Sequence, residues 1–100
     1  MKNPNRETVL KLEHLPNIGK KMANHLEIAG IKSPQSLIGK DAFELYNNLC
    51  KKTGERFDPC VIDVFMSAVD FMEGGEPKSW WEFTSKRKEL LLTRPTPVSL

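Results

Sequence analysis

Apolar residues recur at three- and four-residue intervals along most of this 100-residue chain, the spacing that places them on one face of a helix. No stretch alternates in the manner of a half-buried strand. The pattern predicts short amphipathic helices over residues 6–14 and 20–29, the second ended by Gly30. A longer helix is expected from the capping pattern Asp41-Ala-Phe-Glu44 to Gly54.

Further capping signals complete the set of elements. Ser33-Pro34 is typical of a short turn that begins with a capping serine and a proline. Asp58-Pro59 precedes the most apolar stretch, which should form the central helix of the core and end at Gly74-Gly75. Ser79-Trp-Trp-Glu82 predicts a last short helix. The expected fold is all-α, a compact bundle of about five helices in one domain over residues 1–93, followed by a flexible tail at 94–100.

Composition agrees with a single globular domain. The chain is 39% hydrophobic and 28% charged, enough apolar content to bury one core. No apolar run approaches the roughly 20 residues of a membrane span, and the N-terminus has no apolar segment resembling a signal peptide. We therefore expect a cytoplasmic protein with no membrane partner.

A compact turn stands between the first two expected helices. Pro16 stops the incoming helix, and Asn17 and Gly19 are residue types that tolerate a positive φ in a tight hairpin. Ile18 can act as the apolar plug of the turn. The next helix then begins with backbone amides that have no partner inside the helix, which makes an anion site reinforced by the helix dipole. Lys20 and Lys21 place two positive charges beside it.

This stretch resembles the helix-hairpin-helix family, whose fold is of the sterile-alpha-motif type, and the motif would span residues 9–31. The residues that match the family pattern are Leu15, Pro16, Ile18, Gly19, Lys21, Ala23 and Leu26. Asn17 replaces the first glycine of the pattern and can adopt the same left-handed angles. The resemblance implies phosphate contacts from the backbone amides of Asn17, Gly19, Lys21 and Met22, with Lys20 beside them. It also implies a K⁺ or Na⁺ ion held by the carbonyls of Glu13, Leu15 and Ile18, and no other cofactor.

A longer resemblance covers about two-thirds of the chain. The segments that carry it lie at residues 44–50, 58–65 and 68–69 as well as in the hairpin. They are similar to small bacterial proteins of a pathogenicity-locus helix-hairpin-helix family and, in outline, to the C-terminal domain of bacterial competence regulators. The resemblance implies a bacterial origin and a helical fold.

Charge is distributed unevenly along the chain. Residues 1–40 carry a net +4, residues 41–76 a net −5 and residues 77–100 a net +3, so both ends are basic. In the second basic end, Lys86-Arg87-Lys88 is either a further contact to phosphates or a solvated face. Trp80 and Trp81 either stack on unpaired bases or pack in the core, and we expect at least one of them to pack.

No constellation typical of an enzyme is present. The acidic residues of the central helix, Asp63, Asp70 and Glu73, are expected on a solvated face. Cys50 and Cys60 should be reduced and packed in apolar surroundings, and their spacing to the histidines does not fit zinc. His14 and His25 are expected at the surface or at helix ends.

These patterns lead to two hypotheses. The first is non-sequence-specific DNA binding through the hairpin amides and adjacent lysines, as an accessory or regulatory protein, with branched, nicked or single-stranded sites as candidates. The alternative is an adaptor that uses the same fold to bind proteins without nucleic acid. Because only one hairpin is evident, a second clamp would have to come from a homodimer mate or another protein.

Overall fold

A computed structural model describes residues 9–93, with side chains described through Leu90. These residues form four α-helices, three short 3-10 helices and no strand. In chain order they are η1 (Leu12–His14), α1 (Lys20–Ile28), η2 (Pro34–Leu37), α2 (Ala42–Thr53), α3 (Cys60–Met72), η3 (Trp80–Phe83) and α4 (Thr84–Thr93). The expected all-α class is confirmed for this part of the chain, and the expected tail at 94–100 lies outside it.

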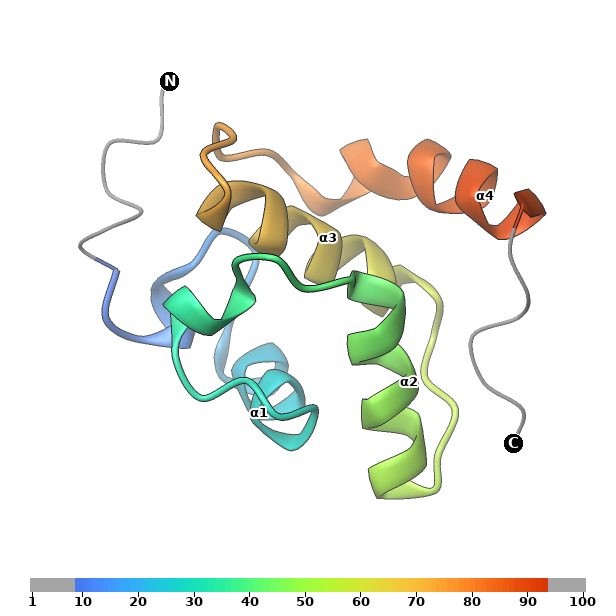
Figure 1. The fold of residues 1–100 in the computed structure, drawn as a ribbon, viewed down its shortest axis with the longest axis horizontal. Coiled ribbons are helices and arrows are strands. Elements are labelled where there is room, and N and C mark those ends of the chain that lie inside the picture. The colour runs from blue at the N-terminus through green and yellow to red at the C-terminus, as the bar shows by residue number, and fades with distance from the viewer. Residues whose placement is uncertain (1–8, 94–100) are drawn as a thin grey trace.

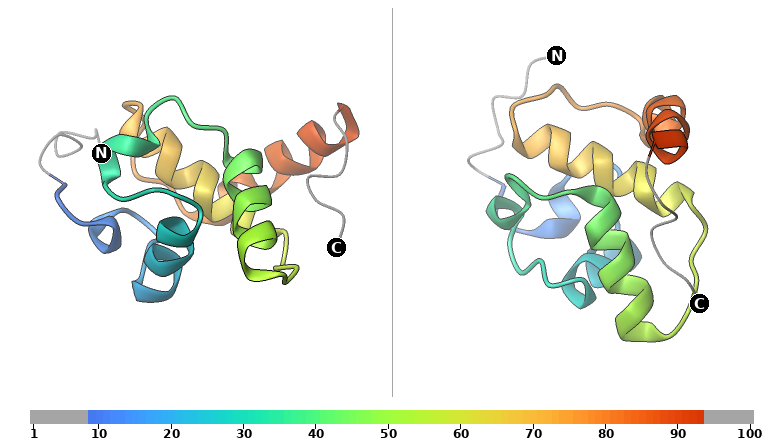
Figure 2. Two further views of the ribbon diagram at one scale, coloured as in Figure 1. Left: turned by 60° about the horizontal axis from the view of Figure 1, so that its bottom comes forward. Right: turned by 45° about the vertical axis from the view of Figure 1, so that its right-hand side comes forward.

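Helix α3 forms the centre of the arrangement (Figure 1). Helix α1 lies on one side of it and α4 on the other, while α2 stands across its N-terminal end. The right-hand view of Figure 2 shows α4 nearly end-on, separated from α1 by α3. None of the helices in the described part is long and apolar enough to cross a membrane.

One hydrophobic core joins these elements, and α3 contributes the most to it, as its sequence predicts. Phe65 and Ala68 have no exposed surface, nor do Leu26 of α1 and Leu49 of α2. Burial of such side chains contributes roughly 1.5–3 kcal/mol each relative to exposure. The core therefore fixes the positions of α1 and α2 against α3.

Several predicted helix ends are confirmed. The Asp41 carboxylate accepts a hydrogen bond from the Phe43 amide at 2.8 Å and caps α2, which ends at Gly54 with φ 72°. The capping box of Ser79 and Glu82 is formed at η3. Gly30 follows α1 with φ 105°.

The helix expected over residues 6–14 is wrong where the structure describes it. Only the single 3-10 turn of η1 forms, and Lys11 before it is extended, with φ −123° and ψ 144°. So short a segment gains too few internal hydrogen bonds to offset helix nucleation, and Pro16 blocks its extension. The described residues accordingly hold four α-helices, where about five helices were expected.

Candidate functional site

The loop between η1 and α1 is fastened to the core by its apolar residues. Leu15 and Ile18 are 3% and 4% exposed, and Ile18 is buried as the expected plug. The Ile18 amide donates to the Leu15 carbonyl at 3.1 Å, and the Leu15 amide donates to the Leu12 carbonyl at 3.0 Å. The loop is therefore a fixed turn with a defined outer surface.

Asn17 occupies the left-handed region, with φ 66°, as its residue type predicts. Its side chain has a second role that the sequence did not reveal. The Nδ2 atom donates to the Lys78 carbonyl at 2.6 Å and to the Ser67 hydroxyl at 3.1 Å. These bonds connect residues 50 and 61 positions apart, so the loop is held against both α3 and the segment before η3.

Gly19 does not have the positive φ expected for it. Its φ of −93° and ψ of −170° are extended angles that any residue adopts. A Cβ atom at this position would meet nothing within 4 Å. Neither backbone strain nor internal packing therefore requires glycine here, and its lack of a side chain leaves the backbone open to close approach from outside.

The N-terminus of α1 carries no side-chain cap. In the described part of the chain, the amides of Asn17, Gly19, Lys20, Lys21 and Met22 have no acceptor. Other helices differ: a carboxylate accepts from the first turn of α2, and the Asp58 carboxylate accepts from the Cys60 amide at the start of α3. Outward amides at a helix N-terminus form an electropositive surface suited to an anion.

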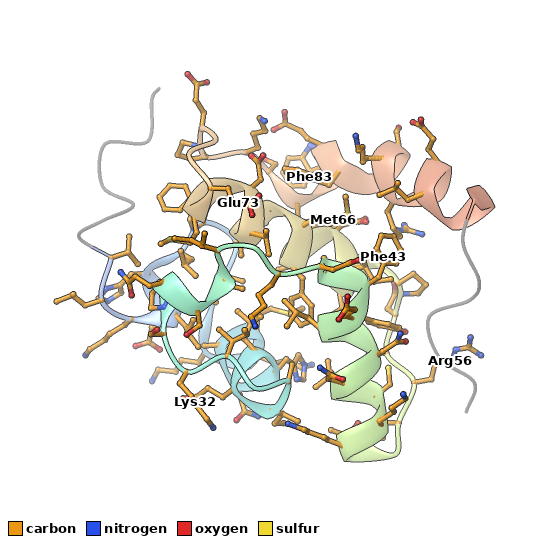
Figure 3. The ribbon with its side chains drawn as sticks, in the orientation of Figure 1. Lys32, Phe43, Arg56, Met66, Glu73 and Phe83 are labelled. Carbon is orange, nitrogen blue, oxygen red and sulfur yellow. The ribbon has the colours of Figure 1, made fainter. Side chains whose placement is uncertain are left out.

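Lysine side chains surround these amides. Lys20 and Lys21 are exposed on the first turn of α1. A hollow of about 410 Å³ lies beside them, between η1 and α1, and Lys11, Lys20 and Lys32 all line it. Figure 3 shows Lys32 extending outward beside α1. Glu13 and Glu27 also line the hollow, so the positive charge is partly offset.

The three carbonyls assigned to a monovalent cation lie in this same loop. The Leu15 carbonyl already accepts the Ile18 amide, while the carbonyls of Glu13 and Ile18 have no backbone donor among the described residues. A carbonyl oxygen has two lone pairs, so the bonded Leu15 oxygen keeps one for a cation. Elsewhere in the described residues, no cluster of three His, Cys, Asp or Glu side chains is placed to hold a metal.

The second basic segment is organised differently from the expectation. The Arg87 Nε atom donates to Asp63 Oδ1 at 2.8 Å, and the Thr84 hydroxyl donates to Asp63 Oδ2 at 2.7 Å. The Asp63 side chain is fully buried and that of Arg87 is 13% exposed. The expectation that Asp63 lies on a solvated face is therefore wrong, because it anchors α4. Lys86 and Lys88 remain exposed.

The two tryptophans have separate environments. Trp80 is half-buried and packs against the core, so the expectation that at least one packs is confirmed. Trp81 is 62% exposed. The two rings make an edge-to-face contact, with centroids 5.7 Å apart and planes at 82°.

His25 is buried on α1, and the expectation of a surface or capping role is wrong for it. Its ring meets Phe57 edge-on at 4.8 Å, and its Nδ1 atom has no hydrogen-bond partner in the described structure. Burial, followed by the charge of Lys21, lowers the pKa of His25, against a smaller raising effect of Glu55. Burial and the nearby charge of Lys21 therefore disfavour the protonated form of the ring. His14 is exposed, and both cysteines are free thiols as expected.

A larger hollow, of about 630 Å³, lies between the start of α2, α3 and the η3–α4 segment. Figure 3 shows Phe43, Met66, Glu73 and Phe83 around it. Its rim is mixed in charge: Lys78 pairs with Asp70 at 3.4 Å, and Glu73 accepts the Gly39 amide at 2.9 Å. Nothing in the local sequence pattern indicated this hollow, because three distant segments form it.

Comparison with known proteins gives two matches. Residues 5–89 match the model of the family described as Pathogenicity locus, Cdd1. The chain is also 41% identical over 80 residues to the mitomycin resistance protein McrB of Streptomyces lavendulae, an alignment that covers 80% of this chain and 76% of that protein. No solved structure is significantly similar.

Proposed function

This chain belongs to the pathogenicity-locus family, and we propose that it binds DNA without sequence specificity, as a binding protein and not as an enzyme. One observation carries the proposal: five outward amides of residues 17 and 19–22 have no acceptor in the described structure, at a helix start where glycine leaves the backbone open. Anions bind such helix starts through main-chain donors and the helix dipole. Lysine side chains and backbone amides are groups that contact the phosphates of nucleic acids, and Lys20 and Lys21 are exposed beside these amides.

The geometry also supports the helix-hairpin-helix interpretation of residues 9–31, with η1 in place of a full first helix. The buried side chains of Leu15 and Ile18 fix the turn to the core. Asn17 adopts the left-handed backbone angle at the position where the family pattern has a glycine. A K⁺ or Na⁺ ion at the carbonyls of Glu13, Leu15 and Ile18 would share the phosphate charge. Contacts of this kind position a protein on the backbone and do not read bases.

The contact should extend from the hairpin into the smaller hollow. Lys20 belongs to both surfaces, and Lys11 and Lys32 continue the positive charge beyond it. We leave Arg87 out of the proposed contact, because its guanidinium is bound to Asp63. With so few free cations, affinity should be modest and strongly dependent on salt. A homodimer or a partner protein would supply a second clamp.

Charge reversal at the hairpin tests this proposal. Labelled duplex, single-stranded and forked DNA are titrated at low salt with wild type and with Lys20→Glu/Lys21→Glu. We expect affinity to fall at least about tenfold and the salt dependence, as log K against log salt, to flatten by about 1.4–1.8, since each phosphate contact contributes about 0.7–0.9. Acidic residues suit the first turn of a helix, so the variant should fold normally.

The chain offers a matched control for this variant. Lys51 and Lys52 form an exposed adjacent pair in the last turn of α2. Lys51→Glu/Lys52→Glu changes net charge by the same amount away from the first turn of α1 and should retain most of the affinity. If wild type binds none of the three substrates at micromolar protein, or if both reversals weaken binding equally, the hairpin is not the DNA contact.

A further inference from the structure

Trp81 is a large aromatic side chain kept on the surface by a well-fixed backbone. Its indole is 62% exposed, although the 3-10 helix that carries it is closed by the capping box of Ser79 and Glu82. On its inner side, the half-buried Trp80 packs against the core and meets the Trp81 ring edge-on. The exposed indole is therefore held in a defined position.

The hairpin is bound to the segment that leads into Trp81. The Asn17 side chain binds the Lys78 carbonyl, and Trp81 follows Lys78 by three residues. Three residues of extended chain span at most about 11 Å, so the Trp81 backbone lies within that distance of the Lys78 backbone. The bond from Asn17 therefore joins the hairpin to the segment that leads into Trp81.

The larger hollow separates two sets of residues on these elements. On α3, Met66, Val69 and Asp70 line the hollow, and Ser67, which contacts Asn17, does not. On the η3–α4 segment, Phe83 and Lys86 line the hollow. Trp81 does not line that hollow, so its exposed indole lies apart from it.

We propose that Trp81 stacks on an unpaired base of the strand whose phosphates lie on the hairpin, so that the preferred ligand is single-stranded DNA or a gap or fork with unpaired bases. This inference rests on the proposed function. Bases inside a duplex are stacked on one another and offer no free face, whereas an indole adds a sequence-tolerant contact to an unpaired base.

Single-residue variants test this inference on the full chain. Binding of a short oligothymidine and of a blunt duplex is measured by anisotropy for wild type, Trp81→Ala and Trp81→Phe. Loss of stacking should lower the affinity of Trp81→Ala for oligothymidine by about 5- to 150-fold, with the duplex affinity within about twofold of wild type. Trp81→Phe should retain most of the affinity, because it keeps a ring. Ile38→Ala, which removes another exposed apolar side chain, is the matched control.

The outcomes separate this inference from the proposal beneath it. If Trp81→Ala binds oligothymidine like wild type while Lys20→Glu/Lys21→Glu does not, the stacking inference fails and the hairpin proposal stands. If Trp81→Ala weakens duplex and single strand equally, its contact is not with an unpaired base and the inference also fails. If wild type binds no DNA, both fail. Circular dichroism of each variant confirms that the fold is unchanged, as expected for an exposed side chain.

Discussion

The polar groups of the two basic regions of this chain differ in whether they are bound within the fold. At the start of α1 the amides and lysines face solvent without acceptors in the described structure. At the junction of α3 with α4, Arg87 and Thr84 are bound to the fully buried carboxylate of Asp63. Positive charge counted from the sequence is therefore available for a ligand in the first region and partly used by the fold in the second.

The largest expected effect comes from breaking the α3–α4 junction. Arg87→Ala leaves Asp63 buried without its ion-pair partner, and we expect a loss of about 3–5 kcal/mol in the free energy of unfolding. Urea unfolding followed by circular dichroism measures it. Replacing both partners, as Asp63→Leu/Arg87→Met, should recover most of the loss, because it removes the charges together.

The same measurement on the hairpin lysines sharpens the contrast. Lys20→Glu/Lys21→Glu should stay within about 0.5 kcal/mol of wild type, as is usual for surface substitutions. A loss below about 1 kcal/mol for Arg87→Ala would show that the buried pair does not anchor α4, and the distinction between the two basic ends would be lost.

The buried ionisable residues of the two regions differ as well, and the pH dependence of stability tests this difference. Asp63 is fully paired, whereas His25 is buried with an unpartnered Nδ1 atom. Because the pKa of His25 is lowered in the folded state, the unfolded chain binds more protons as pH falls below about 6.5. The free energy of unfolding should therefore be highest with respect to this group above that pH and decrease below it, by at most about 1.4 kcal/mol per pH unit.

His25→Phe isolates this contribution, since phenylalanine fills a similar space beside Phe57 and does not titrate. The free energy of unfolding of both proteins is measured from pH 7.5 to 5.5. As pH falls, the wild-type value should decrease relative to that of the variant. A constant difference between wild type and His25→Phe across this range would rule out the neutral buried histidine as a source of pH dependence.

Local signals predicted much of the fold, and long-range pairings explain most of what they missed. Asp41, Gly54 and the Ser79–Glu82 capping box act within four residues of their own helix ends, so the sequence alone places them correctly. Asp63 and Arg87 lie 24 positions apart, and a spacing pattern cannot show that their side chains form a buried pair.

The candidate site divides in the same way. The turn, its apolar plug and the left-handed Asn17 could be predicted, because each depends on residue type at one position. The bond from Asn17 to Lys78 could not, since it depends on how the segment before η3 packs against α3. That bond also joins the hairpin to the segment that leads into Trp81. His25 was missed because the helix face it occupies is covered by Phe57 from a distant loop.

The smallest change in stability gives the most direct test of the amides. Gly19 is the N-cap of α1, and serine at this position can accept a hydrogen bond from an amide of the first turn. Gly19→Ser should therefore stabilise the fold by a few tenths of a kcal/mol while it fills the open space and occupies a phosphate donor. DNA affinity should fall even though the protein becomes more stable, a combination that general damage to the fold cannot produce.

Gly19→Ala separates the two causes of that loss. Alanine adds a Cβ atom where nothing lies within 4 Å but leaves every amide of the first turn free. It should lower stability by less than about 1 kcal/mol, since alanine is a poorer N-cap than glycine, and weaken DNA binding less than serine does. If alanine and serine weaken binding equally, close approach to the backbone matters more than the number of free donors. If both bind DNA like wild type, the α1 amides are not the contact, whatever the lysines contribute.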